Sequence, residues 1–186
     1  MSRIFLIAGL IFSVILPLHS QNLEKDINQI REWFREVNSI ISESNKVMLS
    51  EIEVNQGESS EPFSSEAAKI YRLGKIKMTR YFVDEQLVKM TIEFYGDRED
   101  LTSEYYFKNG NLFFVDKINT VYHRPKWHDE FKASQKSKTK DRFYVKEDRV
   151  IRWSTPDLES VGAMDPAFVE NESMIANDYK QYIKIK

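Results

Sequence analysis

One short segment contains two histidines and two carboxylates, which are residue types that can bind a metal ion or transfer protons. His123 and His128 lie five residues apart, and Asp129 and Glu130 follow directly. Imidazole and carboxylate groups together can bind a transition metal. Their spacing matches no established ligand pattern, Pro125 interrupts the segment, and the neighbouring basic side chains oppose a cation. We therefore expect no metal site here and no cofactor.

The same segment has the residue types that bind an anionic polymer. Residues 122–142 contain seven basic and three acidic side chains, together with Tyr122, Trp127 and Phe131. Cations attract acidic groups, and aromatic rings can stack on flat ligands. The candidate binding residues are Tyr122, His123, Trp127, His128, Lys136, Lys138 and Lys140. The alternative is a solvated loop, roughly residues 122–141, in which Trp127 packs on the edge of the domain.

Catalytic motifs are missing from the sequence. There are no cysteines, so thiol catalysis and cysteine-bound zinc are excluded. No Gly-x-Ser-x-Gly turn is present, and the six glycines form no phosphate-binding loop. No carboxylate pair can be singled out among 29 acidic residues. We expect no catalytic residues and a non-enzymatic binding or interaction module; the alternative is an envelope hydrolase with acid–base carboxylates in a cleft of the sheet.

Residues 1–20 have the pattern of a cleavable signal peptide. Arg3 gives a basic start, Ile4 to Leu16 are an apolar run of 13 residues, and Pro17 ends that run. A membrane-spanning helix needs about 20 apolar residues, although an N-terminal anchor remains the alternative. We expect cleavage near Ser20/Gln21 and a periplasmic or secreted protein. Its partner would be an envelope protein or an anionic glycan.

The remaining residues, 21–186, are expected to form one domain without a transmembrane segment. Removing Arg3 with the leader leaves 26 basic and 29 acidic residues, so no overall positive field attracts nucleic acid. The absence of cysteine also excludes a lipid-modified cysteine after the leader.

The periodicity of apolar residues predicts an α+β fold. A stripe at alternating spacings of four and three predicts a helix over residues 21–45, and Asp165-Pro166 predicts the start of a second helix over 165–184. Between them, residues 67–154 follow a period of two, which predicts an antiparallel meander of about six to eight strands. Met48 to Val54 could add a strand. The stripe residues of the first helix are Leu23, Ile27, Ile30, Phe34, Val37 and Ile41.

A hairpin pattern occurs three times, beginning at Tyr81, Tyr106 and Tyr144. Each copy has a tyrosine, an apolar residue, four mostly polar residues and two apolar residues. In the middle copy Asn109-Gly110 predicts a two-residue type I′ turn, which pairs Phe107 with Leu112 and Tyr106 with Phe113. The outer copies lack glycine, so longer loops are expected there. Both faces of such hairpins are apolar, so the sheet should be covered on both sides or should curl.

The run from Glu104 to Val115 resembles the hairpin of a group of uncharacterised secreted bacterial proteins. These proteins have a leader, an N-terminal helix, YYFKNGKL-type hairpins and a C-terminal helix. More distantly, the hairpins are similar to MORN-like repeats, although their irregular spacing departs from that pattern. The resemblance implies the fold and an exported location, and it implies nothing about activity.

Overall fold

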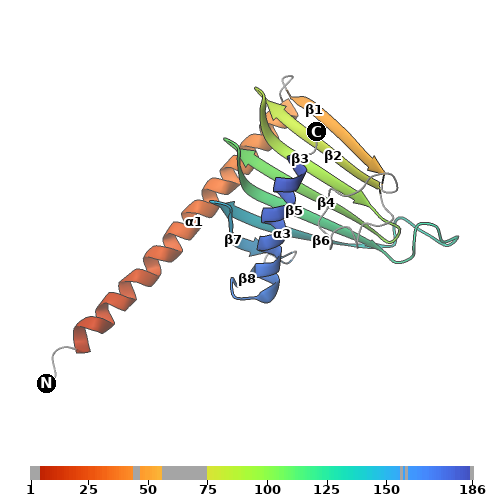
Figure 1. Cartoon of the computed structure of the whole chain (residues 1–186). Coiled ribbons are helices and arrows are strands. Elements are labelled where there is room, and N and C mark those ends of the chain that lie inside the picture. The colour runs from red at the N-terminus through yellow and green to blue at the C-terminus, as the bar shows by residue number, and fades with distance from the viewer. Residues whose placement is uncertain (1–4, 44–46, 56–74, 156, 158, 185–186) are drawn as a thin grey trace.

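The computed structural model describes residues 5–43, 47–55, 75–155, 157 and 159–184. Within these residues, eight antiparallel strands form one sheet in the order of the chain, with a helix at each end of the sequence (Figure 1). The helices are α1 (Phe5–Glu43) and α3 (Pro166–Tyr182). The strands are β1 (Met48–Asn55), β2 (Lys75–Val83), β3 (Gln86–Tyr95), β4 (Glu99–Lys108), β5 (Asn111–Tyr122), β6 (Lys136–Lys146), β7 (Arg149–Ser154) and β8 (Ser160–Val161). The expected α+β meander is confirmed.

All three repeated hairpins have the same two-residue turn. Asn109 and Gly110 have φ values of 52° and 78°, as a type I′ turn requires. The longer loops expected in the outer copies are wrong, because Asp84 and Glu85 have φ values of 48° and 64°. Glu147 and Asp148 repeat this conformation at 52° and 61°. The pairing of the flanking strands therefore keeps the backbone of residues other than glycine in the left-handed region of φ and ψ.

Each hairpin also has a bulge next to its turn. Phe107 pairs with Leu112 as predicted, but Tyr106 pairs with Phe114, so the predicted Tyr106–Phe113 pair is wrong. Phe113 is an extra residue without a partner across the strands. Val88 in the β2–β3 hairpin and Ile151 in the β6–β7 hairpin have the same place. A bulge strengthens the local twist of the sheet and lets Phe113 and Phe114 face the same side.

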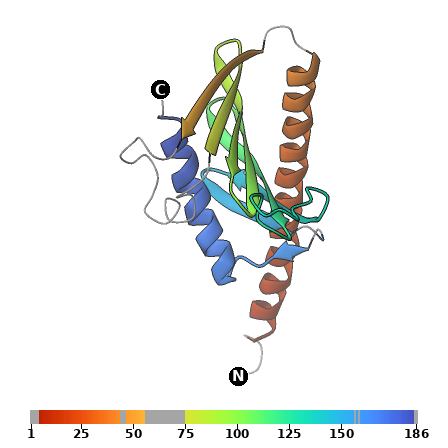
Figure 2. The same cartoon turned by 90° about the vertical axis from the view of Figure 1, so that its right-hand side faces the viewer.

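The two helices cover opposite faces of the sheet (Figure 2). On one face, α1 packs over the ends of the hairpins, and all six predicted stripe residues belong to this core. On the other face, α3 buries Phe168, Ile175, Tyr179 and Tyr182. Asp165 caps α3, since its side chain accepts a hydrogen bond from the Ala167 N–H. A sheet with two apolar faces is thus enclosed by helices from both ends of the chain.

Several boundaries differ from those expected. α1 runs through Ser20 and Gln21, the expected cleavage point, since the apolar run of a leader is itself a good helix former. The sheet begins earlier than residue 67, because Met48–Asn55 is β1 and pairs with β2. Residues 44–45 and 67–74, which the expected helix and sheet included, lie outside the described residues. No helix in the described part of the chain is long and apolar enough to cross a membrane.

Candidate functional site

The expected loop of residues 122–141 is shorter than its composition suggested. Tyr122 ends β5, and β6 begins at Lys136, so residues 123–135 form the connection. The lysines at 136, 138 and 140 alternate with small or β-branched residues, which is the period of a strand. The connection is held against the turn between β3 and β4, where Lys126 N–H donates to the Asp97 carbonyl at 2.8 Å and Tyr122 N–H donates to the Arg98 carbonyl at 2.8 Å.

Tyr122 is part of a closed structural cluster and is not available for stacking. Its ring is buried, and its hydroxyl donates to Asp100 Oδ2 at 2.8 Å. This hydrogen bond to a carboxylate raises the pKa of the Tyr122 hydroxyl. Lys126 pairs with the other oxygen of Asp100 and lies over the Tyr122 ring, and the Phe131 ring contacts Tyr122 edge-on. Within the predicted site, Tyr122 therefore acts as an anchor for the loop.

The histidines do not come together as metal ligands. His128 uses both ring nitrogens within the loop: Nδ1 accepts from the Glu130 N–H at 3.1 Å, and Nε2 lies 3.3 Å from the Arg124 guanidinium. Arg124 also pairs with Glu130. His123 is exposed. Among the residues with described positions, no three histidine or carboxylate side chains gather where they could hold a metal ion.

Besides His123, three of the predicted binding residues are exposed and open to a ligand. Trp127 is 71% exposed, so the alternative in which it packs on the domain edge is wrong. Lys136 and Lys138 are exposed at the start of β6. Lys140 is different, because its ammonium pairs with Asp116 at 2.7 Å. In the predicted set, Tyr122 is thus a buried anchor, and His128 and Lys140 are bonded within the protein. His123 is exposed on the connection, and Trp127, Lys136 and Lys138 form the exposed group considered below.

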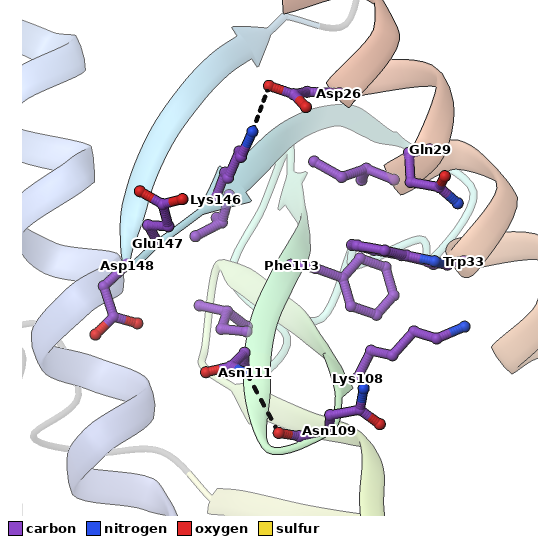
Figure 3. Close-up of a pocket in the computed structure, with 13 residues that line it drawn as sticks. Asp26, Gln29, Trp33, Lys108, Asn109, Asn111, Phe113, Lys146, Glu147 and Asp148 are labelled. Atoms are coloured by element: carbon purple, nitrogen blue, oxygen red, sulfur yellow. Dashed lines mark hydrogen bonds and ion pairs between the residues drawn. The ribbon is translucent and has the colours of Figure 1, made fainter.

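A well-formed hollow lies elsewhere, between α1 and the turns of the β4–β5 and β6–β7 hairpins (Figure 3). We call it the hairpin cleft. Its volume is about 480 Å³, which is within the range of small-molecule sites. Its lining consists of Asp26, Gln29, Ile30, Trp33, Lys108, Asn109, Asn111, Leu112, Phe113, Val145, Lys146, Glu147 and Asp148.

The wall of the hairpin cleft is aromatic and held in place. Trp33 and Phe113 meet edge to face, with 5.6 Å between ring centroids and an interplanar angle of 75° (Figure 3). The Lys108 ammonium lies 5.5 Å from the centroid of the Trp33 ring and pairs with Glu36. Because Phe113 is the extra residue of its bulge, the cleft owes this wall to the same irregularity that the repeats share.

The rim of the hairpin cleft is polar and carries both signs of charge. Asp26 Oδ2 lies 2.8 Å from Lys146 Nζ, and Asn111 Nδ2 donates to the Asn109 carbonyl at 3.3 Å. Asp148 turns away from the cleft toward α3, where it accepts from the Tyr179 hydroxyl at 2.8 Å (Figure 3). This bond, with one from Lys180, lowers the pKa of the Asp148 carboxyl. A rim of this composition does not select strongly for cations or anions.

A row of charged side chains crosses the sheet on the α1 face. Lys89 pairs with Glu104 at 2.7 Å, Glu104 accepts from the Tyr106 hydroxyl at 2.8 Å, and Lys140 pairs with Asp116. Glu104 and Asp116 are cross-strand neighbours. Burial raises the pKa of Asp116, and the neighbouring cations oppose that rise. Each carboxylate is paired with a lysine. The row is therefore best explained as structural, because paired charges can be tolerated on the sheet face that α1 covers.

A second, much smaller cavity lies under α3. It measures about 40 Å³ and contains Lys117, Asp178 and Ser103. Burial lowers the pKa of Lys117 and raises that of Asp178. The volume is sufficient for a water molecule and not for an organic ligand.

Sequence reasoning missed the hairpin cleft, although one signal was present. Trp33 lies beside the main stripe of α1 and widens it, which placed a large aromatic ring at the margin of the helix–sheet contact. No family model matches the chain, and neither a curated protein nor a solved structure matches it.

Proposed function

We propose that the chain is an exported, non-enzymatic binding module and that the hairpin cleft is its ligand site. The observation that supports this most directly is the cleft itself, which combines an aromatic wall with unburied amide groups on a rigid frame. Helix α1 and two tight turns form that frame, so the site exists before a ligand arrives. A preformed site loses little ordering entropy on binding.

The lining favours a small neutral ligand with both apolar and hydroxyl-rich surfaces, for which a sugar ring is the simplest class. The C–H face of a sugar can pack against Trp33, while Asn109, Asn111 and Gln29 can exchange hydrogen bonds with its hydroxyl groups. The rim gives no preference for a phosphorylated or strongly acidic ligand, because Asp26 and Glu147 offset Lys108 and Lys146.

The hydrolase alternative has less support. A glycosidase needs two carboxyl groups that flank the bond to be cut, one of them able to donate a proton. In the hairpin cleft Asp26 is paired with Lys146, and the lowered pKa of Asp148 keeps that carboxyl ionised. The cross-strand pair Glu104 and Asp116 is already bound to lysines.

The cleft can be tested by titrating the isotope-labelled protein with N-acetylglucosamine, maltose and their oligomers while amide spectra are recorded. We expect saturable shifts confined to residues 29–33, 108–113 and 145–148. Asn111→Ala should weaken that binding several-fold, and Asn177→Ala, on the exposed side of α3, is the matched control. If no sugar in the panel shifts these amides, the ligand class is wrong. Turnover of an oligomer during the titration would favour the hydrolase.

Export is tested separately by fractionating cells that express the full chain and sequencing the N-terminus of the product. The leader predicts a product that begins at Gln21 in the periplasm or the medium. A protein that keeps residues 1–20 and stays in the membrane fraction would instead be the anchored form.

A further inference from the structure

The exposed group at the start of β6 is a second surface, distinct from the hairpin cleft. β7 pairs only with Arg142–Lys146, so within the described residues Lys136–Asp141 is bonded to β5 on one side and has a free edge on the other. Lys136, Lys138 and Lys140 alternate along this stretch and face the same side of the sheet. α1 lies over the hairpin-turn end of that side, whereas the 123–135 connection is at the opposite end (Figure 1).

The charge of this surface is not compensated by its surroundings. Opposite Lys136 and Lys138 on β5 are Tyr122 and Thr120, which are uncharged. Among the described residues no ion pair joins Lys136 or Lys138 to a carboxylate, and Asp100, Asp116 and Glu130 are paired with Lys126, Lys140 and Arg124. The two ammonium groups are therefore free for an external anion, and a strand separates alternate side chains by about 7 Å.

Trp127 adds an exposed aromatic ring at the same end of the sheet. The ring is held out by an ordered connection, since Lys126 N–H donates to the Asp97 carbonyl at 2.8 Å and His128 N–H to the Pro125 carbonyl at 3.0 Å. An indole that is 71% exposed does little for folding. An exposed indole at the same end of the sheet as Lys136 and Lys138 is suited to contact a ligand that these lysines bind.

We propose that Trp127, Lys136 and Lys138 bind an acidic polysaccharide. Such a polymer has carboxylate groups along its chain for the two lysines and sugar rings with apolar faces for the indole. The choice of this polymer over nucleic acid rests on the export proposed above, and the surface itself does not depend on the hairpin cleft. A lipid surface fits less well, because Trp127 would be the one large apolar side chain of this group to enter it.

The purified protein can be tested against immobilised alginate, with dextran as the uncharged control, in 50 mM and 500 mM salt. We expect binding to alginate alone and a loss of most binding at high salt. The double change Lys136→Glu and Lys138→Glu should weaken binding on the order of tenfold. The matched control, Lys25→Glu with Lys184→Glu, makes the same change in net charge at exposed positions elsewhere and should stay within twofold.

Lysines on a free edge also prevent strands of other molecules from adding to the sheet, and this role needs charge but no ligand. The changes Lys136→Glu and Lys138→Glu keep a charge at each position and so preserve that protection. A loss of alginate binding without a change in melting temperature therefore separates ligand binding from edge protection. Trp127→Ala should weaken binding several-fold as well, whereas Asn111→Ala in the cleft should not. The proposal is overturned if both double variants weaken binding equally, if alginate is not bound, or if DNA or anionic vesicles bind more tightly than alginate.

Discussion

The turns of the repeated hairpins allow the free-energy cost of a left-handed backbone conformation to be measured in one protein. One substitution introduces this cost at a turn, and another removes it. Gly110 occupies the second turn position at φ 78°, and a Cβ added there meets no atom within 4 Å. The equivalent residue of the β2–β3 hairpin is Glu85, at φ 64°. Gly110→Ala therefore adds conformational strain without a clash, and Glu85→Gly removes it without the loss of a described contact.

The magnitude follows from two opposing contributions. The left-handed region costs a residue with a Cβ roughly 1–2 kcal/mol. Replacing glycine also lowers the conformational entropy of the unfolded chain, which stabilises the folded state by about 0.4–1 kcal/mol. Gly110→Ala should thus lower the free energy of unfolding by about 1 kcal/mol, and Glu85→Gly should raise it by about as much. For a domain of this size, 1 kcal/mol corresponds to roughly 2–4 °C in melting temperature.

Thermal unfolding followed by circular dichroism is a sufficient assay. Gly162→Ala is the control, because Gly162 lacks a positive φ and its added Cβ also meets no atom within 4 Å. That variant should keep or slightly raise the melting temperature. Shifts of the same sign for Gly110→Ala and Glu85→Gly would refute the reasoning, as would a loss in Gly162→Ala as large as that in Gly110→Ala.

Three further predictions concern the helices and the exposed tryptophan. Ile27→Ala should lower the free energy of unfolding by about 3 kcal/mol in chemical denaturation, since Ile27 is fully buried between α1 and the sheet, whereas Val169→Ala on the exposed side of α3 should change it by less than about 0.5 kcal/mol. Tyr179→Phe removes the hydroxyl that donates to Asp148 and lowers the pKa of that carboxyl. A lowered carboxyl pKa stabilises the folded protein at pH values above the pKa of the unfolded chain, near 4, and this stabilisation is lost as the pH falls. The melting temperatures of the two proteins should therefore differ at pH 7 and converge toward pH 3. Trp127→Ala should leave the melting temperature within about 2 °C, and a larger drop would mean that the ring packs.

Much of the fold could be predicted because local patterns agreed with each other. The apolar spacing from Leu23 to Ile41 required a helix with one buried side, and the pair Asn109-Gly110 fixed a turn and hence which residues face each helix. The assignment of Phe107 and Tyr106 to opposite faces is confirmed. What failed was the pairing one step beyond each turn, since a bulge leaves no mark in a run of apolar residues such as Phe113-Phe114.

The candidate site was harder to predict, because its parts meet through contacts distant in sequence. Tyr122 was predicted to be available for a ligand, but Asp100 on β4, 22 residues away in sequence, binds both Tyr122 and Lys126. The hairpin cleft needs Trp33 from α1 beside Lys108 and Asn111 from one turn, together with Lys146 from another. Which turns a helix crosses depends on its angle across the sheet, and periodicity does not encode that angle.

The cover of both sheet faces has a consequence for the order in which the molecule can be completed during synthesis. α1 and all eight strands precede α3 in the chain, so the face that carries Phe107 and Tyr105 stays uncovered until Tyr182 has left the ribosome. A growing chain therefore has no finished core on that face and remains a substrate for chaperones until α3 has been made. Under the export proposed above, late closure by α3 would help to keep the chain unfolded for passage through a translocase.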